Sequence, residues 1–65
     1  PHSTMAWNNL SYSLAELGCV SEAKQAISCA LKIDPGNKNL LATEQDILQY
    51  PNSKSGSACK PIACF

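Results

Sequence analysis

The chain has 65 residues and a formal net charge of zero, with five lysines balanced by five acidic residues. This length allows one small domain, near the lower limit for a chain that folds without help. A neutral chain lacks the positive surface that binds nucleic acids or anionic membranes, so we expect neither as a partner. No apolar run approaches the ~20 residues that span a bilayer. So short a chain favours binding over catalysis, and we expect no enzyme activity and no cofactor.

Three helices are predicted in chain order, over residues 4–17, 21–33 and 38–50. Each begins at or just after a residue whose side-chain oxygen can accept a hydrogen bond from the first free amides of a helix. These expected N-caps are Ser3, Ser21 and Asn37. Gly18 ends the first helix, because glycine adopts the left-handed conformation that often terminates helices. Pro35 ends the second helix by disfavouring helical geometry at the residue before it.

Apolar residues recur at spacings of three and four residues, which predicts one buried stripe on each helix. The stripe residues of the first two helices include Trp7, Leu10, Leu14, Ala23, Ile27 and Ala30. Small alanine side chains allow a neighbouring helix to approach closely. The third helix has its apolar residues at Leu40, Leu41, Ile47 and Leu48. The sequence therefore predicts an all-α fold, a helical hairpin followed by a third helix.

The spacing of these residues resembles that of a tetratricopeptide repeat, a helix–turn–helix unit of 34 residues. The family pattern has an aromatic, a leucine, a small and a large residue on the first helix, then a glycine in the turn. Alanines alternate with a large apolar residue on the second helix, and a proline follows. The matching positions are Trp7, Leu10, Ser11, Leu14, Gly18, Ala23, Ile27, Ala30 and Pro35. One departure is Leu14, where the family commonly has tyrosine.

The resemblance divides the chain into four parts. These are residues 1–3, the end of a preceding repeat or a linker; 4–37, the repeat; 38–50, a capping helix; and 51–65, a flexible Cys-containing tail. Repeats of this kind stack on neighbours to bury both faces. We therefore expect the chain to be the end of a longer array. The alternative is a chain that self-associates through the exposed N-terminal side of its hairpin.

The resemblance also implies a function, that of a scaffold or adaptor binding a peptide segment or partner protein on the concave face of the first helices. The implied contact residues are Asn8, Asn9, Tyr12 and Glu16. Several family members carry an asparagine at the position of Asn9, where an amide can pair with a peptide N–H and C=O. Two alternatives stay open. One is the substrate-recruiting end of a larger enzyme, and the other is a self-associating module with a Cys-based redox or metal role.

Four cysteines, at positions 19, 29, 59 and 64, allow three pairings into two disulfides. Cys29 lies within an apolar helical pattern, where a small buried hydrophobe fits. The spacing lacks the closely paired ligands typical of zinc sites. We therefore predict reduced thiols, no metal site and a cytoplasmic location. A local disulfide between Cys59 and Cys64, and a metal or redox role, are the alternatives.

Overall fold

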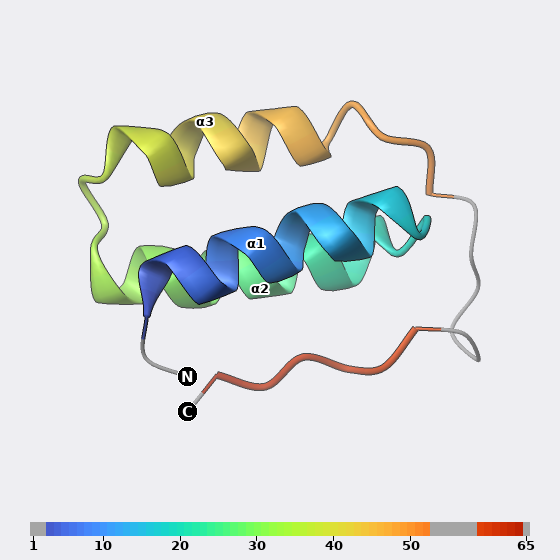
Figure 1. Ribbon diagram of the computed structural model, residues 1–65, viewed down its shortest axis with the longest axis horizontal. Helices are drawn as coiled ribbons and strands as arrows, with labels where there is room; N and C mark the ends of the chain where they lie inside the picture. The colour runs from blue at the N-terminus through green and yellow to red at the C-terminus, as the bar shows by residue number, and fades with distance from the viewer. Residues whose placement is uncertain (1–2, 53–58, 65) are drawn as a thin grey trace.

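The computed structural model describes residues 3–52 and 59–64 and contains three helices in these ranges. They are α1 (Thr4–Glu16), α2 (Val20–Ile33) and α3 (Lys38–Ile47). The predicted all-α class is confirmed. α1 and α2 form an antiparallel hairpin, and α3 lies beside it, parallel to α1 (Figure 1). Parts of the predicted leading segment and of the predicted flexible tail, residues 1–2, 53–58 and 65, lie outside the described residues.

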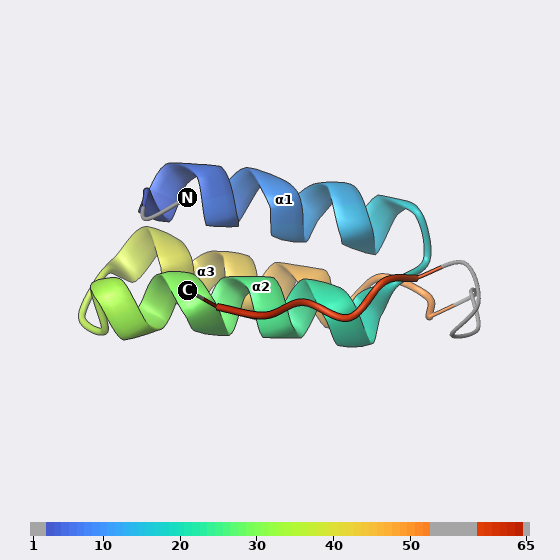
Figure 2. The same cartoon turned by 90° about the horizontal axis from the view of Figure 1, so that it is seen from below.

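Residues 59–64 return along α2 as an extended segment, on the side of α2 away from α3. Figure 1 places this segment on the far side of the hairpin from α3, and Figure 2 shows it running over α2. The backbone N–H of Ile62 donates to Gln25 Oε1 at 3.3 Å, which ties the segment to the middle of α2. The sequence predicted a flexible tail over 51–65, whereas the described residues 59–64 dock on α2.

Two of the predicted N-caps are confirmed. Ser3 Oγ accepts a hydrogen bond from the N–H of Ala6 at 3.3 Å, and Asn37 Oδ1 accepts one from the N–H of Leu40 at 3.2 Å. Gly18 has φ 88°, a left-handed conformation that a residue with a Cβ rarely adopts. These local interactions fix where α1 and α3 begin and where the chain turns into α2.

The predicted N-cap of α2, Ser21, is wrong. The helix begins one residue earlier, at Val20, and Cys19 occupies the cap position without a side-chain hydrogen bond. The N–H of Val20 instead donates to Asn52 Oδ1 at 3.2 Å, across 32 residues of sequence. α3 runs antiparallel to α2, so the chain leaving α3 returns to the start of α2 and supplies the missing acceptor.

α3 is shorter than predicted, since it ends at Ile47 rather than at Tyr50. The following residues form a tighter turn, in which the N–H of Gln49 donates to the carbonyl of Asp46 at 3.0 Å. Pro51 prevents the helix from continuing past Tyr50, and this turn has already replaced the α-helical hydrogen bonds after Ile47.

The core lies where the three helices meet, and it is built from small and branched side chains. Its buried residues are Ala15, Ala23, Ile27, Ala30, Leu40 and Ile47, with Trp7, Tyr12, Leu14, Leu31 and Tyr50 packed around them. The alanines bring α1 and α2 close together. Leu10, assigned by sequence to the same stripe, is 37% exposed, because helical spacing places it at the outer edge of α1.

Candidate functional site

The side of α1 that faces α3 carries the interaction that joins these two helices. The Tyr12 hydroxyl donates to Asp46 Oδ2 at 2.8 Å, and the two residues are 34 positions apart in the chain. Thr43 also interacts with the phenol and lowers its pKa. The hydrogen bond to Asp46, burial and the negative charge of Asp46 outweigh that effect and raise the pKa of Tyr12 above its ordinary value.

The four predicted contact residues differ in accessibility. Asn9 and Glu16 are exposed on α1, and Tyr12 is half-buried against α3. Asn8 is also half-buried, and its Oδ1 is covered without a hydrogen-bond partner in the described part of the chain. Asn9 and Glu16 are therefore the most accessible of these residues to a partner that approaches α1. Asn8 can be contacted only at the part of its side chain that is exposed.

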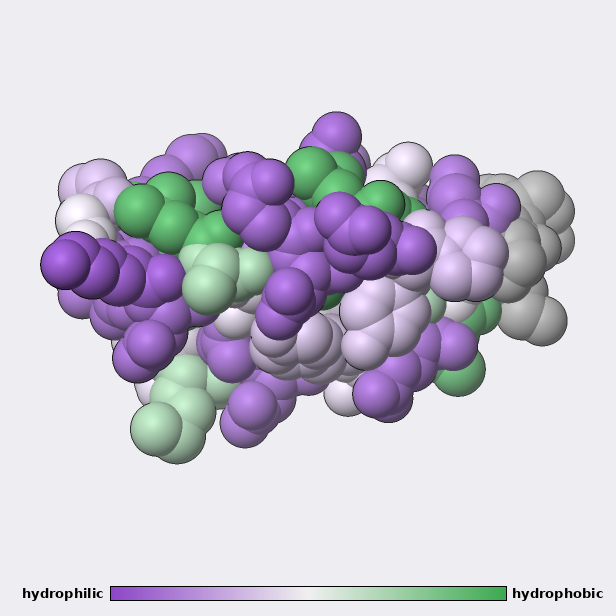
Figure 3. Space-filling view, turned by 90° about the horizontal axis from the view of Figure 1, so that it is seen from above, coloured by the Kyte–Doolittle hydropathy of each residue, from purple (hydrophilic) through white to green (hydrophobic). Residues whose placement is uncertain are grey.

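The charges of this side are mainly negative. Along α1 and α3 the carboxylates are Glu16, Glu44 and Asp46, whereas Lys38 is the single cationic side chain of these two helices. The face on which α3 lies is mainly hydrophilic, with separate hydrophobic patches (Figure 3). This combination suits a ligand that offers hydrogen-bond donors or positive charge.

The two disulfides lie on the opposite side of the hairpin and show that the prediction for the cysteines is wrong. Cys19 is bonded to Cys59 and Cys29 to Cys64, with Cα–Cα distances of 5.8 and 5.5 Å, so none of the four is a free thiol. The predicted reduced thiols and the alternative local pair Cys59–Cys64 are both wrong. In an extended segment, five residues cover roughly 16 Å, far beyond the ~7 Å that a disulfide can bridge between Cα atoms.

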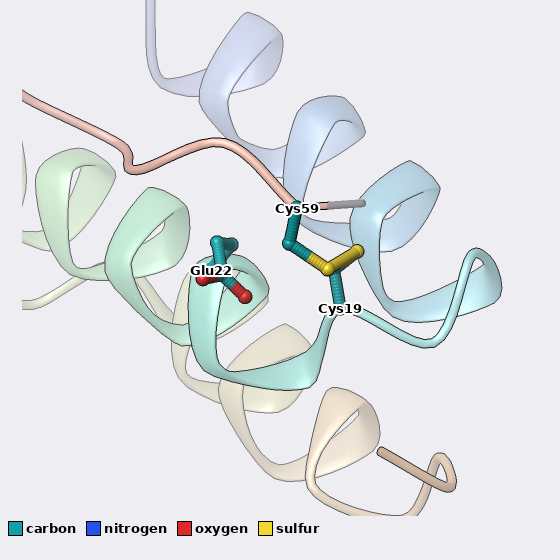
Figure 4. Close-up of side chains that lie close together, drawn as sticks. All are labelled: Cys19, Glu22 and Cys59. Atoms are coloured by element: carbon teal, nitrogen blue, oxygen red, sulfur yellow. A yellow bond between two sulfur atoms is a disulfide. The ribbon is translucent and has the colours of Figure 1, made fainter. Parts of the chain in front are cut away.

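Glu22 lies beside the first of these disulfides, in the first turn of α2 (Figure 4). Its carboxylate and the sulfurs of Cys19 and Cys59 lie within 4.8 Å of one another. A cation would need thiolate ligands here. The two sulfurs are bonded to each other, so in this oxidised form they offer none.

The second disulfide borders an open groove of about 680 Å³ between α2 and the docked segment. Cys29, Cys64 and Ile62 are among its lining residues, and Lys24 and Lys32 contribute its positive charges. Ser21, Gln25 and Ser28 complete the described lining, which contains no Asp or Glu. This groove therefore differs in charge from the side formed by α1 and α3.

Sequence reasoning missed two features of these surfaces. Asp46 was not assigned to the predicted binding face, although it stands one repeat length after Tyr12 and could have been found from that offset. The second is the pair Lys24 and Lys32, which lie eight residues apart in the sequence. Their i, i+8 spacing indicates a shared side, but only the docked segment turns that side into a groove.

Comparisons with protein-family models, with curated proteins and with solved structures give no match to this chain. None of the helices in residues 3–52 and 59–64 has the length and apolar character needed to cross a membrane. The features that can support a function are therefore the geometry and chemistry of these two surfaces.

Proposed function

We propose that the chain is a protein-binding module of the tetratricopeptide type, which binds a peptide segment or partner protein along α1 and α3. The observation that carries the proposal is the hydrogen bond between Tyr12 and Asp46. Residues one 34-residue repeat apart meet across two parallel helices, as successive first helices do in a stacked array. In this arrangement α3 occupies the position, relative to α1, of the first helix of the next repeat.

The chemistry of the exposed residues supports an extended, neutral or basic peptide as the ligand. The amide of Asn9 is exposed and can donate to a peptide carbonyl while accepting from a peptide N–H. Glu16 and Asp46 add carboxylates on the same side of the hairpin. Positive side chains of a ligand would be attracted and acidic ones repelled, which provides selectivity as well as affinity.

Exposed apolar side chains indicate that another repeat or a second copy of the chain packs against this unit. Leu10 on α1 and Leu17 just after it are 37% and 61% exposed, and Leu41 on α3 and Leu48 just after it are 42% and 47% exposed. Stacked repeats bury such residues against their neighbours. Their exposure favours either a place in a longer array or self-association of this chain. Sedimentation over a range of concentrations distinguishes a monomer from a self-associating chain.

The test uses fluorescently labelled, N-acetylated octapeptides in lysine-rich, glutamine-rich and glutamate-rich versions, with binding measured by anisotropy. We expect the lysine-rich peptides to bind most tightly and the glutamate-rich ones least. Asn9→Ala should weaken binding about fivefold to thirtyfold, because one to two hydrogen bonds of ~1 kcal/mol are lost. Gln45→Ala removes an exposed amide elsewhere on α3 and serves as the matched control. Equal losses from both variants would contradict the proposal.

One related possibility follows from the same surface. The module could recruit substrates for a larger enzyme, in which case binding by α1 and α3 would be unchanged and the chemistry would lie in another domain. We propose a binding rather than a catalytic role for this chain itself.

The cytoplasmic location of the chain was predicted from reduced thiols. With all four cysteines paired, we propose instead a compartment in which disulfides persist. Trapping free thiols with an alkylating agent at cell lysis distinguishes the two.

A further inference from the structure

The two disulfides differ in how a reactant could reach them. Cys19 and Cys59 are 2% and 6% exposed, so both sulfurs of the first disulfide are enclosed. In the second, Cys29 is 1% exposed, whereas Cys64 is half-buried and lines the open groove. A thiolate must approach one sulfur of a disulfide directly, and access decides which sulfur it attacks. Cys64 is therefore the most exposed of the four cysteines, and we expect attack at its sulfur.

The charges around this sulfur would favour an anionic reactant. Lys24 and Lys32 line the groove, five residues before and three residues after Cys29 on α2. Eight residues of helix separate the two lysines by about 12 Å along the axis. Both lysines line the same groove as Cys29 and Cys64, and no carboxylate of the described lining offsets their charge. Positive charge attracts anions and stabilises a cysteine thiolate relative to the thiol.

The size of the groove also suits a small molecule. Its volume of about 680 Å³ falls within the ~300–1,000 Å³ typical of small-molecule sites. Ser28 lies between the two lysines on α2, and its hydroxyl adds a neutral hydrogen-bonding group to the lining. A ligand with one or two carboxylates and a thiol could place its carboxylates on the lysines and its sulfur next to Cys64.

We propose that this groove is a site of thiol–disulfide exchange with a small, carboxylate-bearing thiol, which forms a mixed disulfide on Cys64. The thiolate attacks Cys64 Sγ, the Cys29–Cys64 bond breaks, and Cys29 leaves as a thiolate with the bonding electron pair. A second thiolate then attacks the sulfur of the bound thiol and releases Cys64 as a thiolate. Two thiols are oxidised to their own disulfide, and the protein disulfide is reduced by two electrons.

The exchange has a defined structural consequence. It frees the end of the docked segment at Cys64, while the enclosed Cys19–Cys59 disulfide still holds that segment to the start of α2. The segment forms part of the groove, with Ile62 and Cys64 in the lining. Opening the second disulfide would therefore remove one wall of the groove and expose the outer side of α2.

The test compares three probe thiols with the whole chain. They are mercaptosuccinate, which carries two carboxylates, neutral 2-mercaptoethanol and cationic cysteamine. Rates are measured per thiolate at low and high salt, free thiols are then alkylated, and the products are located by peptide mass mapping. We expect mercaptosuccinate to gain roughly tenfold in rate from the positive groove, with high salt reducing the gain. The first product should carry the probe on Cys64 and the alkyl group on Cys29.

Variants that remove one lysine distinguish the effect of the groove's positive charge on the rate from the intrinsic reactivity of each probe thiol. Lys24→Gln and Lys32→Gln should each slow mercaptosuccinate several-fold and 2-mercaptoethanol by a smaller factor, because the lysines also stabilise the departing Cys29 thiolate. Lys38→Gln, at the start of α3, is the matched control and should change neither rate. Circular dichroism checks that each variant keeps its helices. Overturning results would be a probe attached first to Cys19 or Cys59, or a rate for mercaptosuccinate that Lys24→Gln and Lys38→Gln affect equally.

Discussion

The two disulfides predict a specific pattern of stability losses. With Cys19–Cys59 intact, Cys29–Cys64 closes a loop made of ten residues along α2 and five along the docked segment. A loop of about 15 residues corresponds to about 3 kcal/mol in the chain-entropy relation. Cys29→Ala/Cys64→Ala should therefore lower the free energy of unfolding by about 3 kcal/mol. For a chain of this length, that corresponds to a fall of roughly 20 °C in Tm.

The same loop makes a second, stricter prediction. Cys19→Ala/Cys59→Ala leaves Cys29–Cys64 in place and opens the same loop, so it should also cost about 3 kcal/mol. Removing the remaining disulfide as well opens a loop of 35 or 40 residues and should cost about 4 kcal/mol more. The second step should thus be at least as large as the first, because the two loops overlap.

The assay is urea unfolding followed by circular dichroism, with the disulfides of each variant verified by peptide mass mapping. Ser28→Ala, an exposed change on the same side of α2, is the control and should stay within about 0.5 kcal/mol of the parent. Losses below about 1 kcal/mol for either disulfide would refute the reasoning. So would a second step clearly smaller than the first.

Two further predictions concern single hydrogen bonds. Asn52→Ala removes the acceptor for the N–H of Val20 and should lower the free energy of unfolding by about 1 kcal/mol, as loss of an N-cap does. For Tyr12, the raised pKa means that the native state favours the protonated phenol. Its contribution to stability should be complete below the unfolded value of 10.0 and disappear as pH rises through the folded value. The absorbance of phenolate, recorded for the parent and for Tyr12→Phe, should give a midpoint for Tyr12 above 10.0, and Asp46→Asn should lower it.

Each of these tests has its own control and its own contrary result. Asn39→Ala removes an exposed amide whose side chain caps no helix and should leave stability nearly unchanged. If it costs as much as Asn52→Ala, the cap explanation is wrong. In the titration, Tyr50 is the second tyrosine of the chain, so the absorbance recorded for Tyr12→Phe is subtracted from that of the parent to isolate Tyr12. A Tyr12 midpoint unaffected by Asp46→Asn would remove that carboxylate as the cause.

Local sequence determined the three helices and most of their limits. The apolar spacing of α1 and α2, the oxygens of Ser3 and Asn37 and the left-handed Gly18 act within a few residues, so they could be identified without a fold. The all-α hairpin with a third helix follows from them. The start of α2 could not be predicted in this way, because its acceptor, Asn52, comes from 32 residues along the chain.

The side formed by α1 and α3 and the groove on α2 likewise depend on residues that are distant in the sequence. The family resemblance assigned Asn9 and Glu16 to an accessible side of the first helix, and the structure leaves them exposed. Asp46 joins that side only because α3 packs parallel to α1. Lys24 and Lys32 become part of a groove only because residues 59–64 lie along α2.

The pairing of the cysteines shows most clearly what the sequence determined and what the tertiary structure decided. Ten helical residues between Cys19 and Cys29 rise about 15 Å, and five extended residues between Cys59 and Cys64 cover about 16 Å. The sequence therefore determined that a docked segment could match both cysteines of α2. That match holds for either direction of the segment. The direction was decided by α3, which runs antiparallel to α2 and returns the chain to the Cys19 end, so Cys59 meets Cys19 and Cys64 meets Cys29.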